Sequence, residues 1–195
     1  MNFQDEFVDK RREVSRMYND LLERLKDLPV STFKKELQKL INRDPDFFDS
    51  YLLLAELYFE EGATEARNRL IDQAYQRAIR LITDEKEQWP KRLEWGWLQN
   101  RHIIRTLVTK GIQLWESGNN QEALALFRNL LQSNPNDNPG VRFFILAIRM
   151  GMRYEDFQRR FEKEGFYDET LCDWFDKNYK NWPDEFDWWD KLFSE

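Results

Sequence analysis

The stretch from Ile104 to Asp137 constrains the fold most, because residue type and spacing agree there over one complete structural unit of 34 residues. Apolar residues recur every three to four positions on both sides of Gly118, and Pro135 follows the second set. That period is typical of amphipathic helices, while glycine favours the turn and proline ends the helix because it lacks an N–H. The stretch therefore predicts two antiparallel helices, the first ending near Ser117 and the second near Ser133.

Small residues stand where these two helices are expected to touch. Gly111 on the first helix and Ala123 on the second allow a close approach, and Phe127 is large enough to fill the space between neighbouring units. The spacing resembles that of a tetratricopeptide repeat, whose pattern is met here by Leu107, Gly111, Leu114, Ala123, Phe127 and Pro135.

The N-terminal half of the chain contains weaker versions of this unit. Residues 48–82 repeat the first-helix spacing and carry a glycine turn at Gly62, with a second helix about one turn longer than the repeat allows. Before them, the apolar spacing predicts one long helix from Phe3 to Pro29 and a second helix from about 32 to 43.

The same periodicity predicts further helical segments around and after the clearest unit. Its first helix is expected to extend back to about Lys91 or Arg92, and a fourth pair begins at Val141 and ends near Lys163. The remaining residues predict two short helices, at about 167–180 and 184–193.

The resemblance implies an all-α fold, an α-solenoid in which antiparallel helix pairs stack into a right-handed superhelix. Residues 1–165 then form the tetratricopeptide-like array, with 104–137 and 48–82 as its clearest units, and residues 166–195 form an acidic, aromatic, helical C-terminal cap. Members of this superfamily commonly bind a peptide or a partner helix in a concave groove. By analogy, the resemblance implies a non-enzymatic adaptor or scaffold that binds another protein.

The expected groove residues lie on the face of each first helix that points away from its second helix. Nine are expected at the binding surface: Arg101, Arg105, Ile112, Trp115, Arg142, Phe143, Arg149, Phe59 and Glu56. The lysines and asparagines with which the best-known family site grips a carboxylate are missing from the matching positions. The residues present suit a partner with apolar anchors and some acidic character. The alternative is that the large apolar residues among them pack between neighbouring helices.

Charge is unevenly divided along the chain. Residues 1–165 contain 27 acids and 27 bases, whereas residues 166–195 contain nine acids and three bases, so the tail carries the whole net charge of −6. A surface that is neutral on average has no general attraction for nucleic-acid phosphates. No window approaches the ~20 apolar residues of a membrane span, no signal peptide is expected, and Cys172 is the single cysteine. We therefore expect a cytoplasmic protein that binds neither nucleic acid nor membrane.

The tail combines its acids with four of the eight tryptophans, Trp174, Trp182, Trp188 and Trp189. Residues 101–154 carry seven bases and three acids, so the tail and the middle of the array are complementary in charge. We expect the tail to fold back as a hydrophobic cap, because a terminal unit has no neighbour to bury its outer face. The alternatives are a segment that occludes the groove until a partner displaces it, and a free recognition motif.

Little in the sequence favours an enzyme. His102 and Cys172 are 70 positions apart, and no glycine-rich phosphate loop, HExxH motif or zinc-binding cysteine cluster is present. His102 is expected to pack or to hydrogen-bond, and we predict no catalytic residue, metal or cofactor. Two alternatives to the adaptor stay open: a self-associating structural protein, and hence a homo-oligomer, whose groove is occluded by its own tail, and a helical enzyme.

Overall fold

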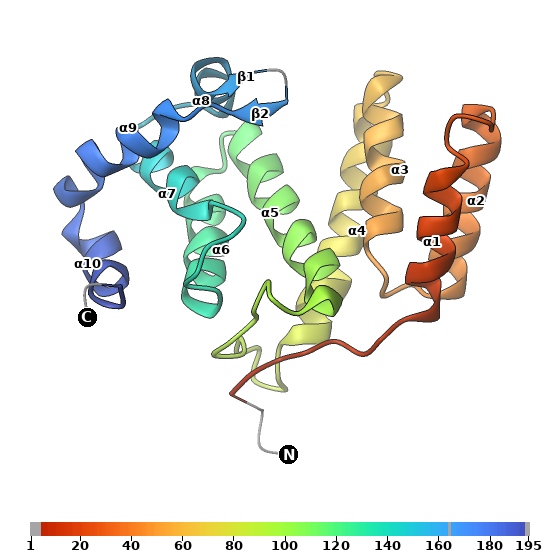
Figure 1. The fold of residues 1–195 in the computed structure, drawn as a ribbon, viewed down its shortest axis with the longest axis horizontal. Helices are drawn as coiled ribbons and strands as arrows, with labels where there is room; N and C mark the ends of the chain where they lie inside the picture. Colours follow the sequence, from red (N-terminus) through yellow and green to blue (C-terminus); the bar gives the residue numbers. More distant parts are fainter. Residues whose placement is uncertain (1–4, 164, 194–195) are drawn as a thin grey trace. The chain divides into compact units, whose positions relative to one another are not determined.

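The structure is a computed structural model that describes residues 5–163 and 165–193 (Figure 1). Its regular structure is almost entirely helical, which confirms the predicted all-α class. The chain divides into two compact units, Met1–Lys110 and Gly111–Glu195, and the division falls inside the helix α5 (Arg101–Glu116). Each unit has its own set of buried apolar side chains.

The first unit is built from four consecutive helices followed by the start of α5 (Figure 1). Each of the first three packs against the helix that follows it in the chain. Phe33, Leu37, Leu54 and Ile71 are among the side chains that are almost completely buried between them. The elements are α1 (Glu13–Glu23), α2 (Val30–Arg43), α3 (Asp49–Glu60), α4 (Thr64–Ile82) and the short 3-10 helix η1 (Leu98–Asn100) before α5.

The N-terminal segment is extended rather than helical. The helix α1 begins at Glu13, so the start predicted near Phe3 is wrong, and Phe3 itself lies outside the described residues. Phe7 donates its backbone N–H to Arg92 O at 2.8 Å, and Arg92 donates its own to Asp5 O at 2.9 Å. These bonds occupy backbone groups that a helix would have paired internally. The sequence also predicted that α5 extends back to about Arg92. It begins at Arg101 instead, because the backbone of Arg92 is paired with the N-terminal segment.

The second unit contains the rest of α5 and a set of mostly shorter helices. Within it, α6 packs against α7, and α7 packs against α9. A β-hairpin with strands of two residues each, which the sequence did not predict, connects α8 to α9. Glu162 lies opposite Tyr167 in antiparallel register. The two predicted tail helices correspond to α9 and α10. The elements are α6 (Asn120–Ser133), α7 (Val141–Arg149), α8 (Tyr154–Phe161), β1 (Glu162–Lys163), β2 (Phe166–Tyr167), α9 (Thr170–Asn178), η2 (Tyr179–Asn181) and α10 (Pro183–Lys191).

Three helices end in the same glycine turn. Each glycine has a φ between +74° and +77°, a left-handed conformation that a residue with a Cβ rarely adopts. The residue after the glycine donates its N–H back to a carbonyl of the preceding helix, at 2.9 Å in all three turns. The next helix follows at once, so each turn joins a helix pair. The glycines are Gly62 after α3, Gly118 after α5 and Gly151 after α7.

A second kind of turn separates successive helix pairs. Asp44–Pro45 follows α2, and Asn134–Pro135 follows α6. Each turn is closed by a backbone bond, from Phe47 N–H to Asp44 O at 3.1 Å and from Asp137 N–H to Asn134 O at 2.9 Å. From α3 onwards, glycine turns within pairs and Asx-proline turns between pairs thus alternate, except that residues 83–97 form a longer connection between α4 and α5. The connection between α1 and α2, residues 24–29, contains no glycine.

Candidate functional site

Two hollows adjoin on the first unit. The first, here called the apolar groove, has a volume of about 640 Å³ and is lined by α3 together with residues of α1, α4 and α5. The second, here called the basic groove, has a volume of about 730 Å³ and is lined chiefly by residues of the N-terminal segment, α1, η1 and α5. Four residues line both hollows, Tyr18, Asn19, Asp49 and Arg105. A ligand lying across these four would contact both grooves.

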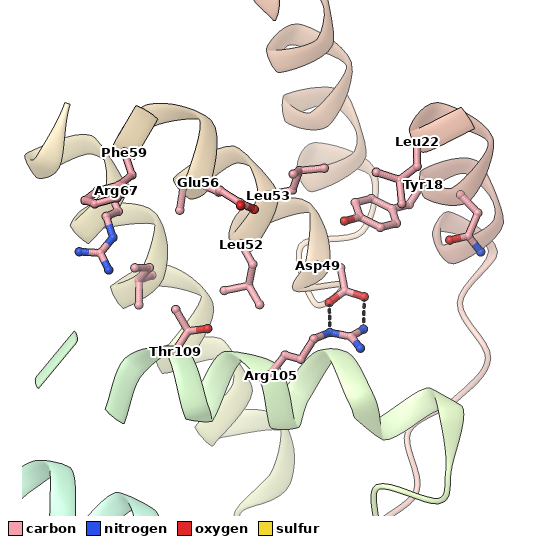
Figure 2. A pocket seen from close by; sticks show the side chains of 13 residues that line it. Tyr18, Leu22, Asp49, Leu52, Leu53, Glu56, Phe59, Arg67, Arg105 and Thr109 are labelled. Atoms are coloured by element: carbon pink, nitrogen blue, oxygen red, sulfur yellow. Dashed lines mark hydrogen bonds and ion pairs between the residues drawn. The ribbon is translucent and has the colours of Figure 1, made fainter. Parts of the chain in front are cut away.

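The apolar groove exposes large apolar side chains that a folded protein usually buries (Figure 2). Phe59 of α3 is 58% exposed and Leu22 of α1 is 37% exposed. Leu52 and Leu53 of α3 are half-buried and line the same hollow. Exposed apolar side chains gathered in one concave surface are typical of binding sites in proteins.

Charged side chains border the apolar groove. Glu56 is exposed on α3, and the guanidinium of Arg67 lies 4.9 Å from the centroid of the Phe59 ring, in cation–π geometry. Arg105 donates two hydrogen bonds to Asp49, from Nε to Oδ1 at 2.9 Å and from Nη2 to Oδ2 at 2.5 Å (Figure 2). This bidentate pair holds in place two of the four side chains that the grooves share.

Basic residues dominate the lining of the basic groove. Asp49 is the one acid among the described residues that line it, against six bases. A concave surface with charges of one sign concentrates ligands of the opposite sign. The bases come from three segments: Lys10, Arg11 and Arg12 of the N-terminal segment, Arg16 of α1, and Arg101 and Arg105 of α5.

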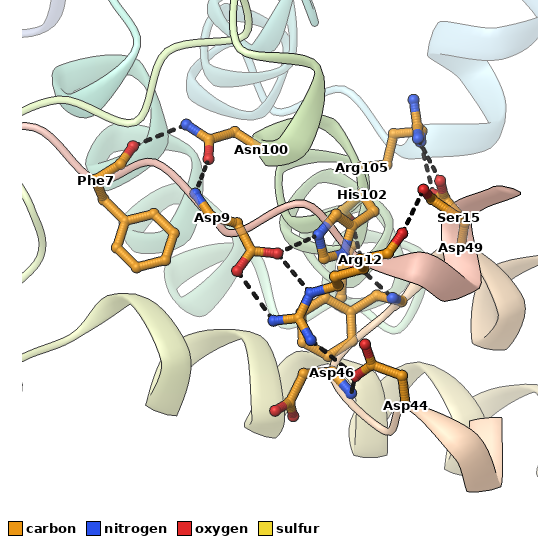
Figure 3. Close-up of polar contacts among 12 residues, drawn as sticks. Phe7, Asp9, Arg12, Ser15, Asp44, Asp46, Asp49, Asn100, His102 and Arg105 are labelled. Carbon is orange, nitrogen blue, oxygen red and sulfur yellow. Dashed lines mark hydrogen bonds and ion pairs between the residues drawn. The ribbon is translucent and has the colours of Figure 1, made fainter. Parts of the chain in front are cut away.

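A buried ion cluster contributes two residues, Arg12 and His102, to the wall of the basic groove (Figure 3). Asp9 accepts hydrogen bonds from Arg12 Nε at 2.6 Å and from His102 Nε2 at 3.0 Å, and Arg12 also donates to Asp44 at 2.7 Å. His102 Nδ1 accepts the Phe48 backbone N–H at 3.2 Å, which assigns the ring proton to Nε2. Burial alone would raise the pKa of Asp9, but the hydrogen bonds from His102 and Arg12 outweigh it and lower the pKa.

The structure brings four of the nine predicted groove residues together in the first unit. Glu56 and Phe59 line the apolar groove, Arg101 lines the basic groove, and Arg105 lines both. Arg101 donates its Nε–H to Trp95 O at 3.1 Å, and its guanidinium lies 5.2 Å from the centroid of a Trp95 ring. These four predicted residues therefore surround one pair of adjoining hollows.

Trp115 is buried in the second unit instead of facing an open groove. Its side chain is 3% exposed, and its ring centroid lies 5.2 to 6.0 Å from those of Phe144, Tyr154 and Phe157. The indole N–H donates to Met152 O at 2.9 Å. The expectation for Trp115 is corrected to the packing alternative, because residues of α7 and α8 cover its ring.

Phe143 is also a core residue, and Arg142 beside it is already paired. Phe143 is 8% exposed, and its ring meets Phe175 of α9 edge-on with centroids 5.3 Å apart. The Arg142 guanidinium lies 4.1 Å from the centroid of the Phe143 ring and donates to Asp137 at 2.9 Å. The expectation that Phe143 faces an open groove is therefore corrected, since the tail helix α9 covers the Phe143 ring. Ile112, another predicted groove residue, is half-buried on α5.

Acidic residues of α10 pair with basic residues of α6 and α7. Glu185 accepts hydrogen bonds from Arg128 Nε at 2.9 Å and from Arg149, and Arg149 also donates to Asp184 at 2.8 Å. The Arg149 guanidinium lies 4.3 Å from the centroid of a Trp182 ring. Burial would raise the pKa of Glu185, but Arg128 and Arg149 outweigh it and lower the pKa. Arg149, the last predicted groove residue, thus contacts the tail.

The N-terminal segment and α1 form one side of the site, and the sequence prediction named no residue from either of them. Lys10, Arg11 and Arg16 line the basic groove, and Tyr18 and Leu22 line the apolar groove. The sequence signals were a run of consecutive bases and an aromatic residue four positions before a leucine, which places both on one helix face. Neither signal indicates that a distant part of the chain supplies the opposite wall.

No family model, curated protein or solved structure matches the chain. Within residues 5–163 and 165–193, no helix combines the length and the apolar character needed to cross a membrane. The same part of the chain holds no group of three or more histidine, cysteine, aspartate or glutamate side chains that could bind a metal ion. The basis for assigning a function is therefore the geometry of the two grooves.

Proposed function

We propose that this protein is a non-enzymatic interaction module that holds a peptide or a partner helix in the apolar groove. The observation that carries the proposal is the exposure of Phe59 and Leu22, from different helices, in one hollow of about 640 Å³. This volume lies within the range of about 300–1,000 Å³ that is typical of ligand sites. A partner that covers these side chains gains roughly 25 cal/mol for each Å² of apolar surface removed from water.

The occupant that fits is an amphipathic segment of a protein. Apolar side chains along α3 and α1 match apolar anchors on one face of such a segment. Arg67 and Arg105 border the same hollow and favour acidic residues next to those anchors. Glu56, exposed on the same surface, is positioned to pair with a basic residue of the partner.

We also propose that the helix pairs are tetratricopeptide-like. The alternation of glycine turns and Asx-proline turns supports this assignment, because each repeat of that superfamily is one helix pair closed by a proline. Arrays of such pairs commonly use an extended surface to bind partners. The single cysteine, Cys172, is exposed and not in a disulfide, which suits a reducing compartment such as the cytoplasm.

Selection from a displayed library of random peptides tests the binding proposal without knowledge of the natural partner. We expect the wild-type protein to enrich peptides with apolar residues at helical spacing. The replacements Phe59→Ser and Leu22→Ser remove apolar surface that lines the groove, and each should weaken binding of the enriched peptides on the order of tenfold, as loss of an anchor residue does.

Val30→Ser is the matched control for these variants. Val30 is 52% exposed on α2 in the same unit and lines neither groove, so its replacement should leave the affinity unchanged. Circular dichroism would establish that all three variants stay folded. Equal affinity of the enriched peptides for the wild type and for Phe59→Ser and Leu22→Ser would overturn the proposal.

A further inference from the structure

The first unit separates its charges in space although they balance in number. Residues 1–110 contain 20 acids and 20 bases, yet six bases and only one acid among the described residues line the basic groove. Such segregation creates a local positive potential on a surface that has none on average. The distribution points to a function of this hollow that net charge does not reveal.

Three of these bases are available to a ligand. Arg12 is committed to Asp9 and Asp44, and Arg105 is committed to Asp49. Lys10, Arg11 and Arg16 are exposed, and the structure shows no hydrogen bond or ion pair for their side chains within residues 5–163 and 165–193.

The backbone that carries these free cations is fixed by buried contacts. Lys10 and Arg11 lie between Asp9 and Arg12, whose side chains are both buried in the ion cluster (Figure 3). The Asp9 backbone N–H donates to Asn100 Oδ1 at 2.9 Å, which ties the segment to the residue just before α5. Because the backbone is held before a ligand arrives, binding loses less conformational entropy than it would on a free segment.

We propose that the basic groove binds the carboxylates of an acidic segment of the same partner whose apolar residues occupy the apolar groove. This proposal rests on the proposed function, and it assigns the partner class: a peptide with a run of Asp or Glu beside its apolar anchors. Tyr18 and Asn19 line both hollows, so one continuous peptide can cross from one groove to the other. Cations that come from several segments around a hollow of about 730 Å³ suit several separate carboxylates better than one compact anion.

An oligoglutamate peptide is the probe, because it lacks apolar anchors and therefore reports on the basic groove alone. We would titrate it into the ¹⁵N-labelled full-length protein and follow the backbone amide resonances. The largest shifts are expected at residues 10–16 and 101–105, and binding should weaken as salt is added. Shifts confined to other parts of the chain would contradict the proposal.

A charge-reversed variant and a matched control distinguish a site from general attraction. The combined replacements Lys10→Glu, Arg11→Glu and Arg16→Glu should weaken oligoglutamate on the order of tenfold or more. The control reverses three bases of the same unit that are exposed and line neither groove, Arg24→Glu, Lys26→Glu and Lys35→Glu. An equal loss in both variants, with both folded by circular dichroism, would overturn the proposal. So would inorganic phosphate binding to the wild type more tightly than oligoglutamate.

The two proposals can fail separately. Phe59→Ser should leave oligoglutamate binding unchanged, because that probe has no apolar residue to lose. If the protein enriches apolar peptides but does not bind oligoglutamate, the proposed function stands and the proposal of an acidic partner segment is refuted. A protein that binds oligoglutamate at residues 10–16 but shows no dependence on Phe59 in the peptide selection would refute the apolar groove alone.

Discussion

Gly111 of α5 lies directly against the ring of Phe127 of α6. A Cβ built on Gly111 would stand 2.3 Å from Phe127 Cε1 and 2.5 Å from Cζ, closer than real Cβ atoms approach other carbons. The expectation of a small residue at this helix contact is confirmed, and its cause is the phenylalanine ring that fills the space.

Gly111→Ala is therefore expected to destabilise the second unit by about 1 to 3 kcal/mol, the usual range for overpacking a core. Phe127→Leu removes the ring atoms that clash, so the double variant should lose less than the sum of the two single losses. Urea unfolding followed by circular dichroism measures all three. Gly96→Ala is the control, because no atom lies within 4 Å of the added Cβ, and strict additivity in the double variant would refute the contact.

The three glycine turns are expected to respond alike to a Cβ. No atom lies within 4 Å of a Cβ added at any of them, so the left-handed φ is the only source of strain. Each change to alanine should cost about 1 to 2 kcal/mol, and each change to asparagine less, because asparagine tolerates this conformation better. Unfolding of Gly62→Ala, Gly118→Ala and Gly151→Ala tests the equivalence, and a variant with no loss would show that its turn is not constrained.

The ion cluster at Asp9 is expected to make the free energy of unfolding depend on pH. Because the pKa of Asp9 is lowered in the folded protein, its contribution is present above the unfolded pKa of about 3.9 and is lost as the pH falls through the folded pKa. Asp9→Asn should cost about 3 kcal/mol near neutral pH, since it leaves Arg12 buried with one partner fewer. The difference from the wild type, measured by urea unfolding, should shrink towards pH 3.

A change at an exposed acid separates this effect from general titration. Asp20 is exposed on α1 and has no ion pair within the described residues, so Asp20→Asn should track the wild type at both pH values. An Asp9→Asn loss that is the same at neutral and acid pH would mean that the carboxylate charge is not the source of the stability.

Removal of the C-terminal tail is expected to destabilise the second unit. Deletion of residues 168–195 uncovers Phe143 and leaves Arg128 and Arg149 without Glu185. Since a buried aromatic face is then exposed to water, the melting temperature should fall and the protein should aggregate more readily. An unchanged melting temperature together with new peptide binding would identify the tail as an occluding segment.

Sequence periodicity was sufficient to predict the helices and turns that are determined by nearby residues. The second helix of the clearest unit was predicted to end near Ser133, and α6 ends there; the glycine turn at Gly118 also lies where it was expected. Phe7 and Val14 are two helical turns apart and imitate one helix, but backbone bonds from residues 5 and 7 to Arg92 override that spacing.

The candidate site depended on contacts that no local pattern specifies. The basic groove combines Lys10 and Arg11 with Arg101, residues about 90 positions apart, and the hydrogen bonds of Asp9 and Phe7 to Asn100 and Arg92 bring them to one hollow. Trp115 was assigned to the correct helix but to an open face, because the sequence does not show that Tyr154 and Phe157 cover its ring. Helix spacing indicates which residues share a face, whereas the neighbouring element decides whether that face is open.

The bonds that fix the N-terminal segment also set an order of events during translation. Asp9 leaves the ribosome before its partners Asn100 and His102, which are 91 and 93 positions further along the chain. At a synthesis rate of about 5–20 residues per second, this delay is roughly 5–20 s. During that interval the run of cations at Lys10 and Arg11 has no anchored backbone, so the basic groove can form only after α5 has been synthesised.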